Sequence, residues 1–395
     1  MKKLTQSPTA SDFVQDPYAF YARARNDGDL FYWEDYKMPM AVSHAAVSTL
    51  LRDRRFGREP VEPRKFPAHL APFYAVEAHS MLELEAPRHT RLRSLVLRAF
   101  TSRRIAGLAP EVETLAHELI DGFPAAGSGV EFDLLPAFAT RIPVIIICRL
   151  LGVPEAMADD LLAWSNAMVS MYQARRTREI ENSAVAATEA FVAFMRGYVE
   201  DRRADPRDDL ITQLIQAEEG GEKLSTDELI TTCILLLNAG HEATVHAMAI
   251  AVKTLLEHRT PKTALAPDAI DQTIEETLRF DPPLHMFTRH AYEDLELFGH
   301  SFKRGDEVGL LLAAANRDPA NWEDPNRFDP TRKIKQNSAF GSGVHFCVGA
   351  PLARLELVNA LPILFDRCPN LRLSQPPDYG NVYHFHGLTR LMVTR

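Results

Sequence analysis

A lone cysteine, Cys347, lies near the end of the glycine-rich stretch FGSGVHFCVG (340–349), and an apolar run typical of a helix, APLARLELVNAL, follows at once. The thiolate is the reactive and metal-binding form of cysteine. A helix N-terminus lowers a thiol's pKa, because its unpaired N–H groups and its dipole favour negative charge. Gly341, Gly343 and Gly349 would permit tight turning and a close approach of the backbone to a large, flat group. These residues predict a thiolate that acts as a metal ligand or as a nucleophile, the alternative being a buried cysteine in an ordinary turn.

Other chemistries fit this stretch less well. A nucleophilic cysteine needs a histidine base and an orienting group, and His345, two residues away, is expected to point elsewhere. The glycine spacing matches neither a dinucleotide fingerprint nor a P-loop. The remaining cysteines are widely spaced and form no C-x-x-C pair, which argues against a zinc cluster or a disulfide framework and favours buried thiols. They are Cys148, Cys233 and Cys368.

Composition narrows the class of protein. The 395 residues are 46% hydrophobic and 25% charged, ordinary values for a globular chain, and we expect one domain, 1–395. The formal charge of -9 argues against a nucleic-acid partner, because phosphate binding needs a basic face. No apolar run approaches the roughly 18–20 residues of a membrane span, and the N-terminus lacks the apolar stretch of a signal segment. The sequence predicts a cytoplasmic protein without a membrane partner.

Hydrophobic periodicity predicts a mainly α fold with a minor β part. Helical patterns cover 109–123, 140–152 and 155–173, and strand-like pieces occur within 29–43, 294–312 and 387–395. Proline and glycine gather at 57–87 and 316–343, which we interpret as long ordered loops. Loops of that length in a compact protein are usually functional.

One long helix is predicted to run through the core. Ser225 and Glu228 fit a capping box, and the apolar pattern continues to about residue 258. Asn238, Gly240 and Glu242 interrupt its apolar middle, although a glycine inside a helix costs about 1 kcal/mol and a buried carboxylate costs more. Such a conflict between local preference and position marks a candidate site.

The cysteine stretch closely resembles the haem-ligand loop of the cytochrome P450 superfamily, F-x-x-G-x-[HR]-x-C-x-G, at Phe340, Gly343, His345, Cys347 and Gly349. Three further stretches resemble the family in the same order along the chain: AGHEAT (239–244) its oxygen-binding groove, EETLRFDPP (275–283) its E-x-x-R helix and DPANWEDPNRFDPTR (318–332) its meander. The resemblance covers nearly the whole chain and implies the cytochrome P450 fold, a large helical domain with small sheets.

The resemblance implies haem b, with Cys347 as the ligand of its iron. A thiolate ligand pushes electron density to the iron and favours O–O cleavage. Two propionates in a largely apolar slot need cationic or hydrogen-bonding partners. The residues implied as propionate partners are His89, Arg93, Arg289 and His345. Further cofactor contacts are expected from Ala239, Phe340, Gly341 and Gly349, although Phe340 fits an ordinary core aromatic nearly as well.

In the family, the residues that match Glu276 and Arg279 form a buried structural pair, which we expect to join the meander at Arg327 or a neighbour. Gly240 is expected to leave room over the haem, and Glu242 aligns with the family's acid for proton delivery. Ala243 stands where the family usually has threonine, so the hydroxyl moves to Thr244, about 100° round the helix. Ordered water, a substrate hydroxyl or Thr244 would then complete the proton relay, or the enzyme would leak peroxide.

By the same resemblance, we expect a monooxygenase that inserts one atom of O2 into a small, largely apolar organic substrate. Its electrons would come from NAD(P)H through a ferredoxin and a ferredoxin reductase. A peroxide-driven peroxygenase and a non-catalytic haem-thiolate sensor remain alternatives. Candidate substrate contacts are Asn238, Leu284, His285, Met286 and Phe385. A basic cluster that would steer an acidic ferredoxin, unless it is merely scattered surface charge, comprises Arg88, Arg91, Arg98, Arg103 and Arg104.

Overall fold

The structure is a computed structural model that describes residues 1–395 apart from 64, 174–175 and 218–220, and apart from the side chain of residue 241. The described α-helices are α1 (Ser11–Gln15), α2 (Tyr18–Arg25), α3 (His44–Leu50), α4 (Ala71–Glu77), α5 (Arg88–Ala99), α6 (Ser102–Ala106), α7 (Ala109–Asp121), α8 (Arg141–Leu151), α9 (Ala158–Val169), α10 (Arg178–Ala204), α11 (Leu210–Gln216), α12 (Thr226–Glu257), α13 (Ile270–Phe280), α14 (Leu312–Asn316) and α15 (Ala350–Arg367). The described strands are short: β1 (Lys3–Leu4), β2 (Leu30–Trp33), β3 (Met38–Ala41), β4 (Phe56–Gly57), β5 (Phe132–Asp133), β6 (Met286–Ala291), β7 (Leu295–Leu297), β8 (His300–Phe302), β9 (Glu307–Leu311), β10 (Arg372–Leu373), β11 (Asp378–Tyr379), β12 (Leu388–Arg390) and β13 (Met392–Thr394). The predicted fold class, mainly α with a minor β part, is confirmed.

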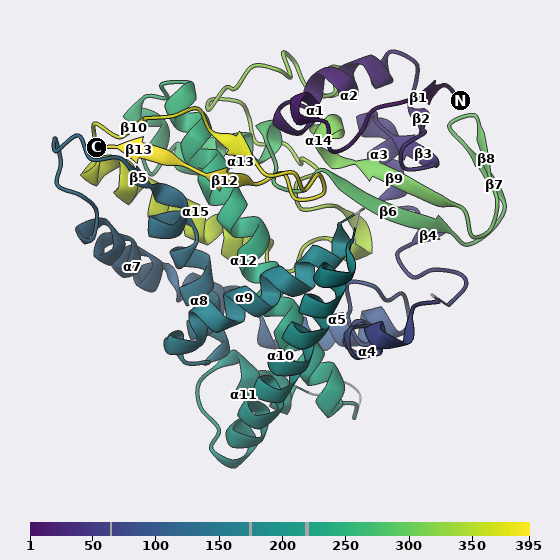
Figure 1. The fold of residues 1–395 in the computed structure, drawn as a ribbon, viewed down its shortest axis with the longest axis horizontal. Coiled ribbons are helices and arrows are strands. Elements are labelled where there is room, and N and C mark those ends of the chain that lie inside the picture. Colours follow the sequence, from purple (N-terminus) through teal and green to yellow (C-terminus); the bar gives the residue numbers. More distant parts are fainter. Residues whose placement is uncertain (64, 174–175, 218–220) are drawn as a thin grey trace.

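The molecule divides into a helical body and a sheet region, with α12 in the body and the N-terminal helices beside the sheet (Figure 1). The largest sheet has the order β1-β2-β3-β9-β6-β4. In it β6 pairs antiparallel with both β9 and β4, so that Arg289 lies opposite Val308 and Ala291 opposite Phe56. This pairing places β6 inside the sheet and fixes the position of Arg289.

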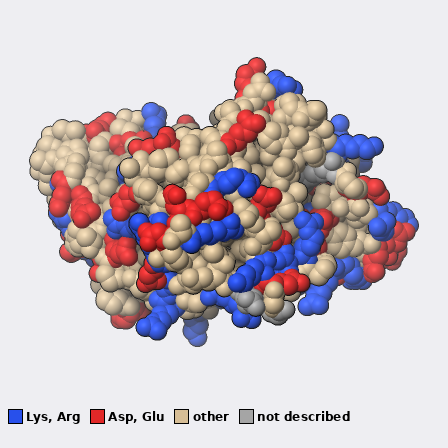
Figure 2. Space-filling model, turned by 90° about the horizontal axis from the view of Figure 1, so that it is seen from below, with Lys and Arg blue, Asp and Glu red and all other residues tan. Residues whose placement is uncertain are grey.

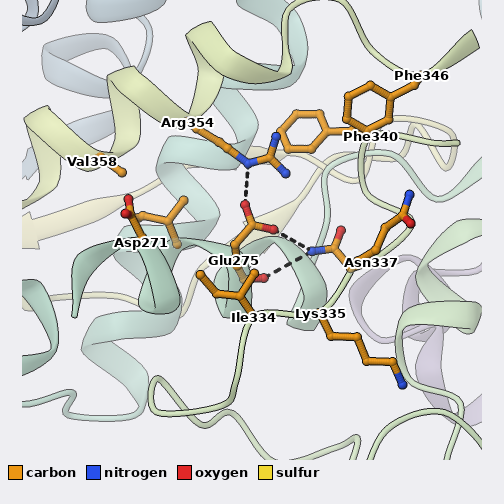
Figure 3. A pocket seen from close by; sticks show the side chains of 11 residues that line it. Asp271, Glu275, Ile334, Lys335, Asn337, Phe340, Phe346, Arg354 and Val358 are labelled. Atoms are coloured by element: carbon orange, nitrogen blue, oxygen red, sulfur yellow. Dashed lines mark hydrogen bonds and ion pairs between the residues drawn. The ribbon is translucent and has the colours of Figure 1, made fainter. Parts of the chain in front are cut away.

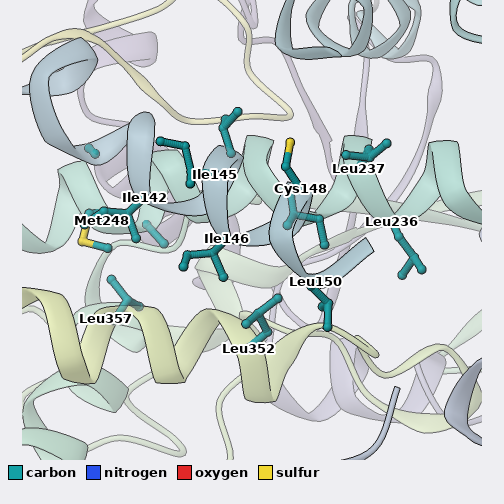
Figure 4. Packing of buried hydrophobic residues seen from close by; sticks show 14 of the residues in the cluster. Ile142, Ile145, Ile146, Cys148, Leu150, Leu236, Leu237, Met248, Leu352 and Leu357 are labelled. Atoms are coloured by element: carbon teal, nitrogen blue, oxygen red, sulfur yellow. The ribbon is translucent and has the colours of Figure 1, made fainter. Parts of the chain in front are cut away.

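The core of the body is built where α8 meets α12 and α15. Nine of the eleven residues of α8 are buried, and its isoleucines interleave with apolar side chains of α12 and α15 (Figure 4). The predicted capping box at the start of α12 is present, since Ser225 accepts from the Glu228 N–H and Glu228 accepts from the Ser225 N–H. Burial of these apolar faces contributes roughly 25 cal/mol per Å², and it holds α12 across the interior.

By length and composition alone, one helix of the described residues, α12, could cross a membrane. The helix reaches a mean hydropathy of 1.2 over an 18-residue window, a length and composition that would suffice, and 59% of that window is buried inside the protein. Because α12 packs against α8, α9, α10 and α13, we interpret it as a core helix.

Two of the loop and helix boundaries also differ from the sequence prediction. The stretch 57–87 contains the helix α4, which begins with a proline in its first turn and packs on α10. The predicted helix over 155–173 is shorter as an α-helix, Ala158–Val169, with 3-10 turns on each side. The stretch 316–343, by contrast, carries no α-helix or strand after α14.

Candidate functional site

The turn that presents Cys347 depends on two glycines with left-handed backbone. Gly341 has φ +67° and Gly343 φ +73°, a region that side chains rarely adopt. A Cβ on Gly343 would also lie 2.4 Å from the carbonyl oxygen of Leu51. After a 3-10 turn at Gly343–His345, the chain places Cys347 two residues before Gly349, the N-cap of α15. The turn is therefore packed on α3 and delivers the sulfur to a helix N-terminus.

The thiol of Cys347 is accessible and yet surrounded by protein. Burial raises its pKa, while the N–H groups of Gly349 and Ala350 and the cations Arg93 and Arg354 oppose that rise. The residue nevertheless retains accessible surface. Both properties hold together when a side chain faces a space inside the protein, with hydrogen-bond donors aimed at its sulfur. A metal ion placed there would meet a preorganised thiolate ligand.

The other three cysteines are buried, as predicted. Burial raises the pKa of Cys148 and of Cys233 to about 12 in each case. A thiol with such a pKa is neither a nucleophile nor a ligand at pH 7. Among the described cysteines, only Cys347 combines accessible surface with donors at the sulfur.

The middle of α12 also borders an internal space. Ala239 is exposed, and Asn238, Gly240, Glu242 and Ala243 are half-buried, although the helix runs through the core. Asn238 directs its amide nitrogen at the sulfur of Met168, 3.8 Å away. Accessible surface both here and at Cys347 fits a flat group between α12 and the cysteine turn.

Gly240 lies where α12 approaches α8. A Cβ at this position would lie 3.1 Å from the side chain of Ile147, so the glycine allows α12 to approach α8. The expectation that Gly240 also leaves room over a haem stays a prediction.

The side chains that follow Gly240 differ in what they face. The carboxylate of Glu242 lies 3.7 Å from Nε2 of His246, one helical turn further on. Thr244 is 5% exposed and so does not share the accessible row formed by Glu242 and Ala243. Sequence analysis did not single out His246, because an isolated histidine on a helix carries no motif.

Three of the four predicted propionate partners lie around the turn that carries Cys347. Arg93 of α5 donates to the carbonyl oxygen of Phe346 at 2.7 Å. The rings of His89 and His345 lie 4.3 Å apart, and Nε2 of His345 lies 2.8 Å from Glu85. Burial lowers the pKa of both histidines, that of His89 to about 4. At pH 7 they are therefore neutral and serve as hydrogen-bond donors rather than as charges.

Arg289 is a buried cation without a carboxylate partner among the described residues. It is 2% exposed and donates a hydrogen bond to the neighbouring carbonyl oxygen of Thr288. No carboxylate of the described residues lies within ion-pair distance of it. Burial, reinforced by the nearby Arg58, lowers its pKa to about 9, so it remains cationic at pH 7. A buried cation without an anion is costly, and a propionate would remove that cost.

Arg58 is a further cation of this group that sequence analysis missed. Its guanidinium lies over the ring of Phe287 at 5.3 Å, and that of Arg289 lies at 5.9 Å from the same ring. Arg58 pairs with Glu83 at 3.0 Å. No sequence motif marks Arg58 within the predicted loop 57–87, because only folding brings this residue next to β6.

Glu276 and Arg279 form a fully buried bidentate pair, with N···O distances of 2.7 and 2.8 Å. Arg279 also donates to the carbonyl oxygens of Asn316 and Pro325, both at 2.9 Å. The second arginine on Glu276 is Arg332, at 3.1 Å. Arg327, which was expected in that place, contributes its carbonyl oxygen, and its side chain pairs with Asp329 instead.

A cavity of 600 Å³ lies beside the cysteine turn, between α13, α15 and the chain at 334–340. Phe340 and Phe346 line it together with Arg354, whose guanidinium lies 4.5 Å from the centre of the Phe340 ring (Figure 3). The carboxylate of Glu275 connects two sides of this cavity, since it accepts hydrogen bonds from Arg354 and from Asn337. Phe340 is half-buried, so it packs between this cavity and the turn.

Four predicted substrate contacts lie close together but differ in access. Leu284 and Phe385 are half-buried and form an isolated β-bridge. His285 is completely buried, and its Nδ1 lies 2.9 Å from the hydroxyl of Tyr21. Met286 is 5% exposed and belongs to the core of the sheet region. For His285 and Met286 the prediction was wrong, because they hold β6 and the C-terminal segment in place.

The predicted basic cluster is largely paired with acids. Arg88 lies 3.9 Å from Glu59, Arg91 pairs with Glu228 and Arg104 lies 2.6 Å from Asp208. Figure 2 shows the same mixture on the face that it draws, where Lys and Arg side chains alternate with Asp and Glu. Pairing reduces the long-range field that these arginines exert.

Comparisons with known proteins agree with this geometry. The cytochrome P450 family model matches residues 15–266 and 269–378. The chain is 37% identical over 384 residues to cytochrome P450 107B1 of Saccharopolyspora erythraea, covering 93% of this chain and 91% of that protein. It is 36% identical to the cytochrome P450 monooxygenase PikC of Streptomyces venezuelae, covering 95% and 92%.

Among solved structures, P450BioI in complex with a hexadec-9Z-enoic acid ligated acyl carrier protein matches with a TM-score of 0.91 and 31% identity, covering 97% of this chain and 99% of that one. The polyketide synthase cytochrome P450 PksS of Bacillus subtilis matches with a TM-score of 0.88, 31% identity and coverage of 98% and 99%. A thiolate turn, a helix with an accessible middle and a buried cation without an anion are what a haem with two propionates requires, and the chain belongs to the cytochrome P450 family.

Proposed function

We propose that this haem-binding monooxygenase takes its electrons from NAD(P)H through a ferredoxin and its reductase, in the cytoplasm, and inserts one oxygen atom into a small, largely apolar molecule. The observation that carries the proposal is the thiol of Cys347, which keeps accessible surface while the N–H groups of Gly349 and Ala350 are directed at its sulfur. When bound, the haem supplies the redox chemistry that activates dioxygen.

The residues of the chain would divide the remaining tasks. Cys347 supplies the ligand, and the donors at its sulfur stabilise the thiolate. Arg93 and Arg289 would hold the propionates as cations, with His89 and His345 as neutral N–H donors. Glu242 would hand protons to the oxygen site, and the apolar side chains of α8 and α12 would keep other water out of it.

The proposed electron donor is tested by reconstitution of the activity. Purified holoenzyme is combined with ferredoxin, ferredoxin reductase and NADPH, with peroxide alone, or with neither. We expect product with the first mixture. Product with peroxide alone would instead favour the peroxygenase, which the missing hydroxyl at Ala243 makes reasonable. If no product forms with the ferredoxin mixture or with peroxide, both readings are contradicted.

Since Arg88, Arg91 and Arg104 are paired with acids, we expect the rate at which ferredoxin reduces the enzyme to fall only modestly between low and physiological salt.

The substrate class is tested by a spectral screen. A substrate that displaces water from the iron changes the spin state and the absorption spectrum of the haem. Names and titles of related proteins supply the first compounds: mycinamicin IV, vitamin D3, testosterone and hexadec-9Z-enoic acid. We expect a larger spectral change with apolar compounds than with small polar acids, because the apolar residues Ala239, Ala243 and Phe385 all keep accessible surface.

A further inference from the structure

Proton delivery is the step for which the chain lacks a familiar residue. Ala243 has no hydroxyl, and Thr244, the nearest alternative in sequence, is 5% exposed and turned into the packing of α12. Glu242 therefore needs another group that can both bind and release a proton. Such a group must lie near the carboxylate and must also be reachable by water.

His246 has both properties. Its Nε2 lies 3.7 Å from Oε1 of Glu242, and the two side chains keep 17% and 19% of their surface accessible. The separation exceeds a direct hydrogen bond, so a bridging water or a small side-chain rotation completes the contact. Nδ1 of His246 is buried without a hydrogen-bond partner in the described residues. The ring therefore has one nitrogen, Nε2, directed at a titratable group.

The C-terminal segment is shaped around this ring. A Cβ on Gly387 would lie 2.2–2.4 Å from three atoms of the His246 imidazole, so only glycine lets the ring occupy its position. His386, the preceding residue, interacts electrostatically with His246. The C-terminal segment therefore packs directly against the imidazole ring of His246 and holds it in place.

Charged and titratable groups of more than one element surround His246. On its own helix, Glu242 lies one turn earlier, with its carboxylate 3.7 Å from Nε2. In the C-terminal segment, His386 lies 3.7 Å from Asp281, and Asp281 lies 3.5 Å from Lys253. Burial lowers the pKa of His386 to about 4, so at pH 7 it is neutral and does not repel a charge on His246.

The neighbouring group Asp281, His285 and His386 could also be considered as a metal site, since its ligand atoms lie within 4.8 Å of one another. However, Asp281 already accepts hydrogen bonds from Tyr18 and Tyr379 and lies beside Lys253. A lysine cation in that position disfavours a divalent ion. The group is better explained as a buried polar support for the segment that carries Gly387.

We propose that His246 is the proton-relay residue that reloads Glu242, in place of the hydroxyl missing at position 243. This rests on the proposed monooxygenase cycle. In each transfer the N–H bond at Nε2 of the imidazolium breaks and an O–H bond forms at the Glu242 carboxylate. The imidazole is left neutral and regains its proton from water, so no electron moves and no further reactant is needed.

The interaction between Glu242 and His246 is tested first, in an enzyme that does not turn over. Histidines are labelled with ¹³C in the reduced, carbon-monoxide-bound holoenzyme, and the pKa of His246 is measured by NMR. We expect Glu242→Gln to change the ring ¹³C signals of His246 and their pH dependence, because the neighbouring carboxylate is lost. A His246 pKa that is the same in both proteins overturns the proposal. His258, an exposed histidine at the C-terminal end of α12, serves as the internal control and should not shift.

The relay is then tested by NADPH consumption with excess ferredoxin and reductase, without added substrate. We expect His246→Gln to slow consumption roughly tenfold or more and to remove the acidic pH dependence of the rate, whereas His258→Gln behaves as the wild type. Imidazole added to His246→Ala should restore part of the rate. Gly387→Ala, which displaces the ring without removing it, should resemble His246→Gln.

The two proposals fail in different ways. If the ferredoxin route is wrong, the wild type and His258→Gln both fail to consume NADPH. If the relay is wrong, the wild type, His246→Gln and Gly387→Ala consume NADPH at equal rates with equal pH profiles. Retention of the red-shifted carbon monoxide band in each variant shows that haem and fold are intact.

Discussion

At the scale of single residues, the role of Cys347 rests on donors rather than on the cysteine alone. The N–H groups of Gly349 and Ala350 oppose the rise in thiol pKa that burial causes, and this supports the proposal that the sulfur is the haem ligand. We expect Cys347→Ser to lose the red-shifted absorption band of the reduced, carbon-monoxide-treated protein. Cys368→Ala, a buried thiol away from the turn, should retain it. A normal band in Cys347→Ser would contradict the ligand assignment.

A second residue-scale prediction concerns the missing hydroxyl. Ala243 shares the accessible side of α12 with Glu242, whereas Thr244 does not. We expect Ala243→Thr to lower the peroxide released per NADPH consumed, because a hydroxyl then stands where the proton is needed. Thr244→Val should leave that ratio unchanged, and a large rise in Thr244→Val would show that the buried hydroxyl serves the relay after all.

At the scale of elements, the Glu276–Arg279 pair joins α13 to the meander. Both side chains are 1% exposed, and Arg332 and the Asp329 N–H complete the network on Glu276. We expect Glu276→Ala to lower the free energy of unfolding by about 3–5 kcal/mol, because Arg279 is left as an unpaired buried charge. Urea unfolding and haem content per protein measure the effect.

The exposed pair in the same meander provides the control for that prediction. Arg327→Ala removes only the contact with Asp329, and Arg327 is 67% exposed. Its effect should stay below about 1 kcal/mol. Equal losses in the two variants, or normal haem content and stability in Glu276→Ala, would contradict a structural role for the buried pair.

Elements with strong local patterns were predictable from the sequence. The long helix α12, its capping box and the helices α7 and α8 follow from apolar periodicity and cap residues. The strand β6 was not predicted, because Met286–Ala291 has little strand character of its own and is held by pairing with β9 and β4. The helix α4 was missed because proline-rich surroundings hide its short apolar face.

The candidate site divides in the same way. The turn at Cys347 was predicted by motif, since its glycines and cysteine are consecutive in the chain. Contacts between distant segments were not predictable, because no local pattern records them: His345 meets Glu85 across 260 residues. His285 also looked like a substrate contact until the fold placed it against Tyr21.

At the scale of the whole molecule, burial of neutral histidines couples stability to pH. His285 and His386 are 0% and 3% exposed. Burial lowers the pKa of His386 to about 4 and that of His285 well below its ordinary value of 6.5. Between these values and 6.5 the unfolded chain binds more protons than the folded protein. Stability is therefore fully present above about pH 6.5 and is lost as the pH falls toward 4.

The size of this loss can be assigned to one residue. For His386 a pKa difference of about 2–3 units corresponds to about 3 kcal/mol between pH 6.5 and 4. We expect His386→Gln to flatten the fall in unfolding free energy over this range, measured by urea unfolding of the holoenzyme at several pH values. His117→Gln, at an exposed position on α7, should keep the wild-type slope. If His386→Gln also keeps it, protonation of His386 does not limit the acid stability of the protein, and His285, whose pKa burial also holds well below 6.5, becomes the group to replace next.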